Sequence, residues 1–243
     1  MEIRICENYE EMSLQTAAFI ADYVNRKPEA VLCFPAGETP AGTFRRLVEW
    51  AREGKVDFSR CSFIGLDEWA GLDRFDDGSC QGFLYDKLFT PLSIPEANIH
   101  FFDACADDLE LECKRMDGII AAKGGIDLMY VGLGMNGHIG LNEPGADLDS
   151  YSRVVELDAV TKSVGQKYFA KPTKLDKGIT LGMKHLLEAE TVLLAASGVK
   201  KAAIVKEVVR GEPTNRVPGS ILQLHANGYL YLDREAASEI ADS

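Results

Sequence analysis

The 243-residue sequence contains no apolar run long enough to cross a membrane and no cluster of basic residues. Its 38 Asp and Glu residues outnumber its 26 Lys and Arg residues, which gives a formal net charge of −12 at pH 7. A chain with this charge repels the phosphate backbone of nucleic acids, and a membrane-spanning helix needs about 20 apolar residues. We therefore expect neither a nucleic-acid partner nor a membrane span.

The six cysteines are spread along the chain, with no CxxC pair and no Cys–His cluster at the spacing of a zinc site. Because 46% of the residues are hydrophobic, the chain can bury a full core without a disulfide framework. The first residues, Met-Glu-Ile-Arg-Ile, do not resemble a signal peptide. We therefore expect a cytoplasmic protein that needs no metal ion or other cofactor.

Short apolar segments alternate with amphipathic segments along the chain. The pattern predicts strands at 30–34, 62–66, 126–131, 191–196 and 229–232. It predicts helices at 12–25, at 39–53, over Phe83, Leu84 and Leu88 with Ser79 as N-cap, at 107–123, before Gly211 and at the acidic C-terminus. Strands separated by helices pair in parallel through right-handed crossovers. The sequence therefore predicts an α/β protein: a single doubly wound, mostly parallel, Rossmann-like sheet with helices on both faces.

No repeat, low-complexity tract or linker divides the chain, so residues 1–243 are expected to form one domain. The segment 147–177 has the least regular pattern. Long irregular segments are often functional, so this one is expected to act as a lid or to line a pocket.

The most informative segment is Gly-Leu-Gly-Met-Asn-Gly-His-Ile-Gly-Leu-Asn-Glu-Pro-Gly at 132–145, directly after the apolar run 126–131. It carries His138 on a glycine-rich turn, with Gly137 before it and Glu143 five residues later. Ligands of open parallel sheets bind beyond the carboxyl ends of the strands, so this turn is well placed for chemistry. The alternative is an ordinary glycine-rich turn with a surface histidine.

A second strand end reads Phe-Pro-Ala-Gly-Glu-Thr-Pro at 34–40 and leads into a helix with Thr39 as its expected N-cap. Unpaired N–H groups and the helix dipole make such a turn an anion site, here formed by Gly37, Glu38 and Thr39. The carboxylate of Glu38 must then point away from the anion. The alternative is an ordinary strand-to-helix turn.

Two further strand ends carry charged residues. Asp67 and Glu68 follow the strand 62–66, and successive side chains point in opposite directions, so only one of them is expected to enter a shared site. Lys201 follows the strand 191–196 near a helix start, where a lysine is unfavourable unless an anion lies nearby. Capping acids and solvated lysines are the alternatives. Together, these strand ends predict an acid/base site for a small phosphorylated molecule.

These segments, in this order, resemble the glucosamine-6-phosphate deaminase/isomerase family over nearly the whole chain. The matching motifs are Ala-Gly-Glu-Thr-Pro at 36–40, Leu-Asp-Glu-Trp at 66–69, Asn-Gly-His-Ile-Gly-Leu-Asn-Glu-Pro-Gly at 136–145 and Ser-Ile-Leu-Gln-Leu-His at 220–225. The related 6-phosphogluconolactonases share a glycine–histidine loop but lack the following Asn-Glu-Pro. The resemblance implies an enzyme that isomerises and deaminates a 2-amino-2-deoxyhexose 6-phosphate.

The resemblance also implies acid/base roles for individual residues. His138 would open the sugar ring, with Glu143 holding its imidazole, and Asp67 would carry a proton from C2 to C1. Glu68 would be a neighbour in the substrate site and not the base. Asn136 stands where some members have aspartate and brings no charge, so the histidine must rely on Glu143.

The resemblance places the substrate phosphate on the turn at 37–39, together with Lys201 and Lys167. Lys167 stands where the family commonly has arginine, and it offers a point charge instead of a bidentate fork.

Two other functions are compatible with these residues: hydrolysis of a sugar-phosphate lactone, which needs no base at C2, and non-catalytic sensing of a sugar phosphate. The combination of Asp67, His138 and Glu143 favours an enzyme over a sensor. The sequence leaves the choice between glucosamine and galactosamine open, and it is compatible with a homo-oligomer.

Overall fold

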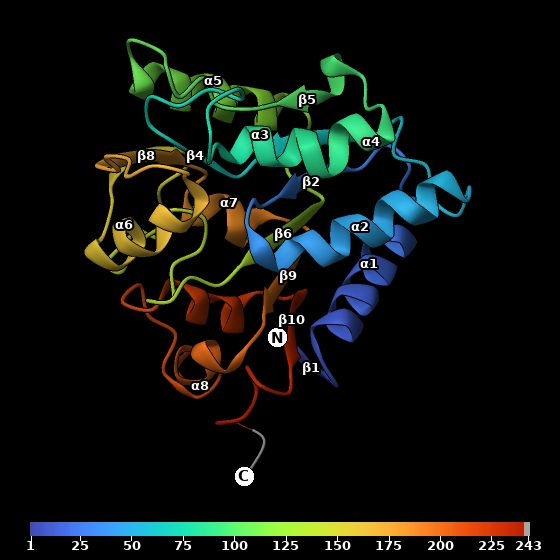
Figure 1. Ribbon diagram of the computed structural model, residues 1–243, viewed down its shortest axis with the longest axis vertical. Coiled ribbons are helices and arrows are strands. Elements are labelled where there is room, and N and C mark those ends of the chain that lie inside the picture. The colour runs from blue at the N-terminus through green and yellow to red at the C-terminus, as the bar shows by residue number, and fades with distance from the viewer. Residues whose placement is uncertain (241–243) are drawn as a thin grey trace.

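The computed structural model describes residues 1–240, and a seven-stranded parallel sheet forms its centre (Figure 1). The strand order is β1-β10-β9-β6-β2-β3-β5. The strands are β1 Glu2–Cys6, β2 Val31–Phe34, β3 Ser62–Gly65, β5 Ile99–His100, β6 Leu128–Gly132, β9 Thr191–Ala196 and β10 Gly228–Asp233. From β2 the chain continues outward to β3 and β5 and then returns to β6 on the other side of β2. The strand order therefore reverses between β2 and β6, where open α/β sheets bind their ligands.

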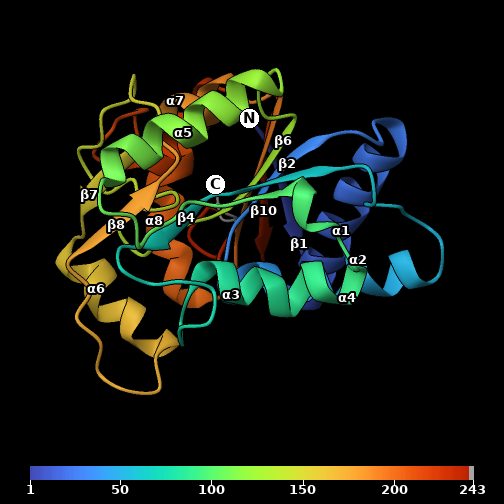
Figure 2. The ribbon, with the colours of Figure 1, turned by 90° about the horizontal axis from the view of Figure 1, so that it is seen from above.

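Helices cover both faces of the sheet, as the sequence predicts. Figure 2 shows α5 and α7 on one side and α3 and α4 on the other. The helices are α1 Tyr9–Arg26, α2 Glu38–Arg52, α3 Cys80–Leu84, α4 Thr90–Leu92, α5 Leu109–Ala122, α6 Ala159–Gly165, α7 Met183–Glu188 and α8 Ala202–Arg210. A π-helical turn, η1 Tyr85–Phe89, and 3₁₀ turns complete the set: η2 Glu96–Asn98, η3 Gln166–Tyr168, η4 Val199–Lys201 and η5 Pro218–Leu224. Within residues 1–240, no helix combines the length and apolarity needed to cross a membrane.

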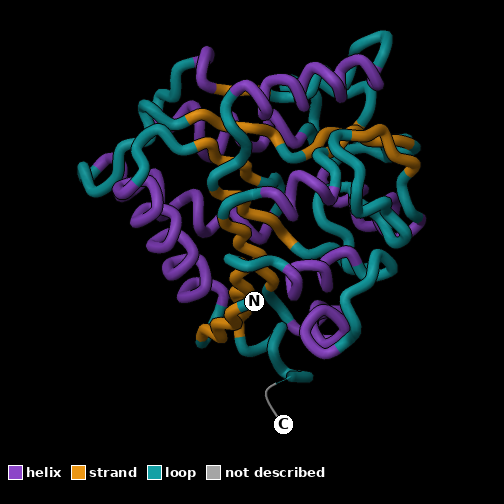
Figure 3. The backbone as a smooth tube through the Cα atoms, turned by 180° about the vertical axis from the view of Figure 1, so that it is seen from behind, coloured by secondary structure: helices purple, strands orange, loops and turns teal. Residues whose placement is uncertain are grey.

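The sheet divides the hydrophobic core into two layers, because successive strand residues point to opposite faces. In β2, Leu32 and Phe34 pack in the layer that holds α1 and α2, whereas Val31 and Cys33 pack in the layer that holds α5. All four residues are buried, as expected for a parallel strand covered on both sides. Seen from behind, the strands run through the middle of the molecule between these layers (Figure 3).

The predicted elements are present with small shifts at their ends, apart from two differences. Helix α2 begins at Glu38, and its N-cap is Gly37 with φ of 112° instead of the predicted Thr39. This left-handed backbone conformation is one that glycine adopts without strain. The predicted acidic C-terminal helix is replaced by turns up to Ile240, and the remainder of that prediction lies outside the described residues.

The segment 147–177 is more regular than the sequence indicates, since it contains α6 and the strand β7 Arg153–Glu156. Strand β7 pairs with β8 Lys177–Thr180, which in turn pairs with β4 Asp67–Trp69 in a small antiparallel sheet. A third apolar cluster includes residues of this sheet and consists of Trp69, Leu141, Val155, Leu157 and Leu175. The small sheet thus connects the segment to the strand end that carries Asp67.

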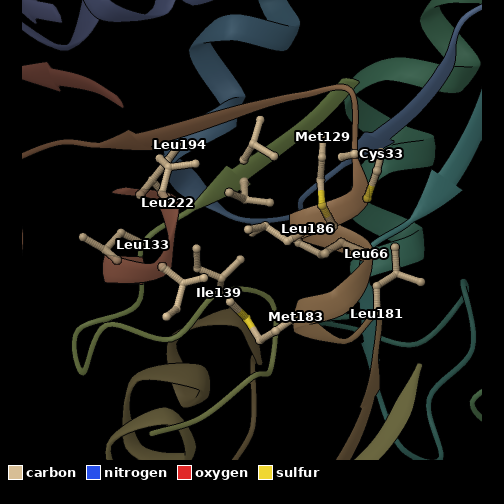
Figure 4. Close-up of a cluster of buried hydrophobic side chains, with 14 of the residues drawn as sticks. Cys33, Leu66, Met129, Leu133, Ile139, Leu181, Met183, Leu186, Leu194 and Leu222 are labelled. Carbon is tan, nitrogen blue, oxygen red and sulfur yellow. The ribbon is translucent and has the colours of Figure 1, made fainter. Parts of the chain in front are cut away.

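The loop after β6 is anchored in the core at both of its ends. Leu133 and Ile139 are buried in the same apolar cluster as Met183 (Figure 4). Between them, the backbone N–H of Gly134 donates a 2.9 Å hydrogen bond to the carbonyl of His138. His138 therefore sits on a short loop whose two ends are held by packing.

Candidate active site

A cavity of about 820 Å³ lies beyond the carboxyl ends of the central strands, with α6 along one side. Of the residues singled out from the sequence, those that line it are Gly37, Glu38, Thr39, Asp67, His138, Lys167 and Lys201. Glu68, Asn136, Gly137 and Glu143 are not part of the lining. The fold therefore brings the separate strand ends to one site. Four of the predicted residues lie outside the lining of this site.

Protein groups contact the imidazole of His138 on two sides. Its Nδ1 lies 3.1 Å from the hydroxyl oxygen of Thr161 and 3.4 Å from a carboxylate oxygen of Glu143. The ring also covers Gly134 so closely that a Cβ atom there would lie 2.4 Å from Nε2. Since Nδ1 is engaged by protein groups, Nε2 is the nitrogen available to a ligand.

Thr161 could not be identified as a site residue from the sequence. It lies on α6, which has only seven residues and too few turns for a clear helical pattern. The one relevant signal was the length of the irregular segment, which pointed to the region and to no particular residue.

Glu143 lies behind His138 and is itself held by hydrogen bonds. The side-chain amide of Asn136 donates to it at 2.9 Å and the backbone N–H of Asp158 at 3.2 Å. Burial alone would raise the pKa of Glu143, but hydrogen bonds with His138, Thr161 and Asn136 lower it to about 2. The carboxylate is therefore ionised at neutral pH and is a hydrogen-bond acceptor on the Nδ1 side of the imidazole.

Asp67 is the first residue of β4 and lines the cavity. Burial and the negative charge of Glu68 raise the pKa of Asp67 to about 7, although a hydrogen bond from the Cys80 thiol lowers it. A carboxyl group with a pKa near neutrality can accept and return a proton at physiological pH.

Glu68 points away from the cavity. Its buried carboxylate accepts hydrogen bonds from the Ser79 hydroxyl at 2.9 Å and from the backbone N–H groups of Cys80 at 3.0 Å and Gln81 at 2.8 Å. These N–H groups belong to the first turn of α3, where no partner exists within the helix. Glu68 is thus the capping acid of the adjacent pair and not the substrate neighbour that the resemblance implies.

The positive side of the cavity contains two lysines. Burial and the positive charge of Lys167 lower the pKa of Lys201 to about 8. Lys167 forms a 2.7 Å ion pair with Glu38, whose side chain is 77% exposed. The carboxylate of Glu38 is thus directed to Lys167, and an anion bound between the lysines would relieve their mutual repulsion.

The turn that leads into α8 already holds an anion from the chain itself. The carboxylate of Asp233 accepts hydrogen bonds from the Ser197 hydroxyl at 2.6 Å and from the backbone N–H of Gly198 at 3.0 Å. The Gly198 N–H is therefore already used within the chain. This segment lines the cavity with Ser197 and Lys201, and the Nζ of Lys201 also donates to the carbonyl of Leu133.

The cavity thus combines an imidazole, a carboxyl group that titrates near pH 7 and two lysines. This set of groups can bind a small anion and move protons on it. Among residues 1–240, no three His, Cys, Asp or Glu side chains are placed to hold a metal ion.

Residues 7–231 match the family model described as glucosamine-6-phosphate isomerases/6-phosphogluconolactonase. The chain belongs to this family. Two curated relatives, the glucosamine-6-phosphate deaminases of Thermoanaerobacter pseudethanolicus and Clostridium botulinum (strain Kyoto), are each 36% identical to it. The first alignment covers 100% of this chain and 96% of the relative, and the second covers 99% of each. The resemblance inferred from the motifs is therefore confirmed.

Solved structures of the family have the same fold. A structure described as a monomeric glucosamine-6-phosphate deaminase matches with a TM-score of 0.95 at 34% identity, covering 98% of this chain and 100% of that one. The 6-phosphogluconolactonase from Leishmania guyanensis matches with a TM-score of 0.80 at 19% identity, covering 99% of this chain and 98% of that one. The predicted doubly wound α/β fold is confirmed, and the likeness to the lactonase concerns the fold alone.

Proposed function

We propose that this protein converts a 2-amino-2-deoxyhexose 6-phosphate and water into a ketohexose 6-phosphate and ammonia, as a step of amino-sugar catabolism. The observation that carries this proposal is the presence of Asp67 and His138 in one cavity with Lys167 and Lys201. The curated relatives, which match the whole length of the chain, are glucosamine-6-phosphate deaminases. They make glucosamine 6-phosphate the first substrate to test.

Ring opening is assigned to His138. Its Nε2 donates a proton to the ring oxygen of the pyranose and takes one from the anomeric hydroxyl, which gives the open-chain amino aldehyde. Ionised Glu143 and the hydroxyl of Thr161 hold the ring at Nδ1 and stabilise the imidazolium that this exchange requires.

Proton transfer from C2 to C1 is assigned to Asp67. Its carboxylate takes the C2 proton while a proton passes from the protonated amino group to O1, which leaves an enolamine. Asp67 then returns a proton to C1, which gives the protonated imine of the ketose. Water adds to C2 of this imine, and the nitrogen leaves as ammonia. Because the pKa of Asp67 is about 7, both protonation states are accessible at neutral pH.

The 6-phosphate is assigned to the turn at 37–39 and the two lysines. The N-terminus of α2 directs backbone N–H groups at an anion, and Lys201 and Lys167 supply positive charge. This local site is needed because the chain as a whole carries a net charge of −12. Lys167 is already paired with Glu38, so the phosphate competes with Glu38 for Lys167.

We also propose that the protein works in the cytoplasm, because a charged sugar phosphate crosses an apolar membrane only at high cost. One copy of the chain supplies the acid/base groups and both lysines, so the proposed reaction does not depend on a homo-oligomer.

The test is ammonia release from glucosamine 6-phosphate and galactosamine 6-phosphate, without added metal ion or nucleotide. Asp67→Asn should reduce the rate by about 10²–10⁴-fold while the protein still binds substrate, since a general base contributes a factor of this size. Asp86→Asn is the matched control. Asp86 also lines the cavity, but its carboxylate pairs with the neighbouring Lys87 at 2.8 Å, so the rate should be unchanged.

The same assays separate the other functions. Hydrolysis of 6-phosphogluconolactone that survives Asp67→Asn, with no ammonia release from either amino sugar, would identify a lactonase. Tight binding of the sugar phosphates with no turnover of any of them would identify a sensor.

A further inference from the structure

The motif Ser-Ile-Leu-Gln-Leu-His at 220–225 is part of the family resemblance, yet the proposed function uses none of its residues. The motif forms most of η5 and lies outside the lining of the cavity. Ser220 is completely buried, with an exposed fraction of 0%. A buried hydroxyl without hydrogen bonds is costly, so the contacts of Ser220 indicate what the motif does.

The hydroxyl of Ser220 closes a turn formed by residues 214–220. Its Oγ accepts a 2.9 Å hydrogen bond from the backbone N–H of Thr214 and donates at 3.1 Å to the carbonyl of the same residue. Within the turn, the N–H of Val217 donates to the carbonyl of Thr214 at 3.1 Å, and the N–H of Ser220 donates to the carbonyl of Val217 at 2.8 Å. One side chain thus joins the two ends of the 214–220 turn.

The 214–220 turn is hydrogen-bonded to the loop after β6 at two points. The backbone N–H of Gly219 donates to the carbonyl of Gly137 at 2.8 Å. The carbonyl of Asn215 accepts a hydrogen bond from the backbone N–H of Gly145, also at 2.8 Å. These two contacts use opposite ends of the turn and opposite ends of the loop segment 137–145.

Close packing accompanies these hydrogen bonds. A Cβ atom on Gly137 would lie 2.9 Å from Cγ1 of Val217, and a Cβ atom on Gly219 would lie 2.6 Å from Cδ1 of Leu133. The backbones of the turn and the loop therefore approach each other as closely as glycine allows. Leu222 of η5 belongs to the same apolar cluster as Leu133 (Figure 4).

The two hydrogen-bonded points flank the side chains that must meet for ring opening. His138 directly follows Gly137, and Glu143 lies two residues before Gly145. Nδ1 of His138 is 3.4 Å from a carboxylate oxygen of Glu143. A shift of either end of the segment changes this distance, and the 214–220 turn holds both ends.

We propose that Ser220 is a positioning residue for His138: its hydroxyl keeps the 214–220 turn closed, and the closed turn holds the imidazole against Glu143. This role rests on the proposed function of His138 in ring opening. Ser220 acts through the loop, because it lies outside the cavity and neither contacts the substrate nor transfers a proton.

The kinetic test measures kcat and KM for ammonia release from glucosamine 6-phosphate in Ser220→Ala, together with the inhibition constant of inorganic phosphate. The substitution keeps the Cβ atom, so the site stays filled, but the ends of the turn lose their link. We expect kcat to fall about 10- to 100-fold, because a catalytic group displaced by about 1 Å loses a factor of this size. KM and the inhibition constant should stay unchanged, because the proposed phosphate-binding groups lie outside 137–145.

Thr16→Val is the matched control. It also removes a completely buried hydroxyl, but this one donates at 2.6 Å to the carbonyl of Met12 within α1. Its kcat should equal that of the wild type. A wild-type kcat in Ser220→Ala would overturn the proposal, and so would a rise in KM with no loss of kcat.

A second measurement needs no substrate and therefore stands even if the deaminase assignment fails. Backbone hydrogen exchange is followed by mass spectrometry, with a peptide of β9 as internal reference for a peptide that covers 137–145. In Ser220→Ala, exchange in 137–145 should become about 10-fold faster, because a buried hydrogen-bonded link is lost, whereas exchange in β9 should not change.

The exchange rates separate the two assignments. Unchanged exchange in 137–145 would overturn the proposal, and so would equal acceleration in β9, because Ser220 would then support the fold as a whole. Faster exchange confined to 137–145, in a protein whose wild type releases no ammonia, would reject the deaminase assignment and confirm that Ser220 positions the loop.

Discussion

Replacing Gly134 with alanine should disable His138 without removing any polar group from the site. A Cβ atom built on Gly134 would lie 2.4 Å from Cδ2 and Nε2 of the imidazole, whereas ordinary contact begins near 3.4 Å. The ring must therefore retreat by about 1 Å. Its Nδ1 is held by Thr161 and Glu143, so the retreat breaks or lengthens those contacts.

A displacement of this size can lower a catalytic rate about 10²-fold, which corresponds to about 2.7 kcal/mol in the activation free energy. The assay is kcat for ammonia release from glucosamine 6-phosphate, alongside calorimetric binding of inorganic phosphate. Phosphate binding should be retained, because the three atoms nearest to the added Cβ all belong to the ring of His138.

Gly118→Ala is the matched control, since a Cβ on this glycine of α5 would meet nothing within 4 Å. It should leave kcat unchanged and stabilise the helix by about 0.5–1 kcal/mol. If Gly134→Ala keeps the wild-type kcat, the imidazole is not held in the orientation described here, and its assignment as the ring-opening group loses its structural basis.

The remaining predictions concern the phosphate and the support of the imidazole. Lys201→Ala should raise the KM of the phosphorylated sugar about 10- to 150-fold, because a hydrogen bond to a charged group is lost; equal KM values for phosphorylated and unphosphorylated sugars in the wild type would contradict this site. Glu38→Gln frees Lys167 from its ion pair and should lower the inhibition constant of inorganic phosphate severalfold at low ionic strength; no change would place Lys167 outside the phosphate site. The pKa of Glu143 falls from 4.5 to about 2 on folding. Its ionised form therefore contributes roughly 3 kcal/mol to the free energy of unfolding above pH 4.5, and this contribution is lost as the pH falls toward 2. Urea titrations of Glu143→Gln should therefore show a stability deficit at pH 7 that shrinks at pH 3, and a deficit that is equal at both values would argue against this pKa.

The periodic elements were predictable because their signals are local. The segment 191–196, in which five of six residues are apolar, predicts a buried strand, and β9 spans Thr191–Ala196. The glycine-rich turn before His138 was predictable as well, since it directly follows such a strand and glycines mark a backbone close to a ligand. The strand β7 and the helix α6 were not predictable, because each is too short to show a period. Strand β7 depends in addition on its pairing with β8.

The sequence alone determined the order of strands and helices, and therefore which chemical groups reach the carboxyl edge of the sheet. It could not determine which other groups each of these side chains contacts at that edge. Asp67 and Glu68 are adjacent and chemically alike, yet β4 turns one toward the cavity and the other into the first turn of α3. His138 and Thr161 are 23 residues apart and meet only because the small sheet brings α6 beside the loop after β6. Such contacts depend on long-range pairing, which the local pattern of apolar and polar residues does not encode, so only the tertiary structure decides them.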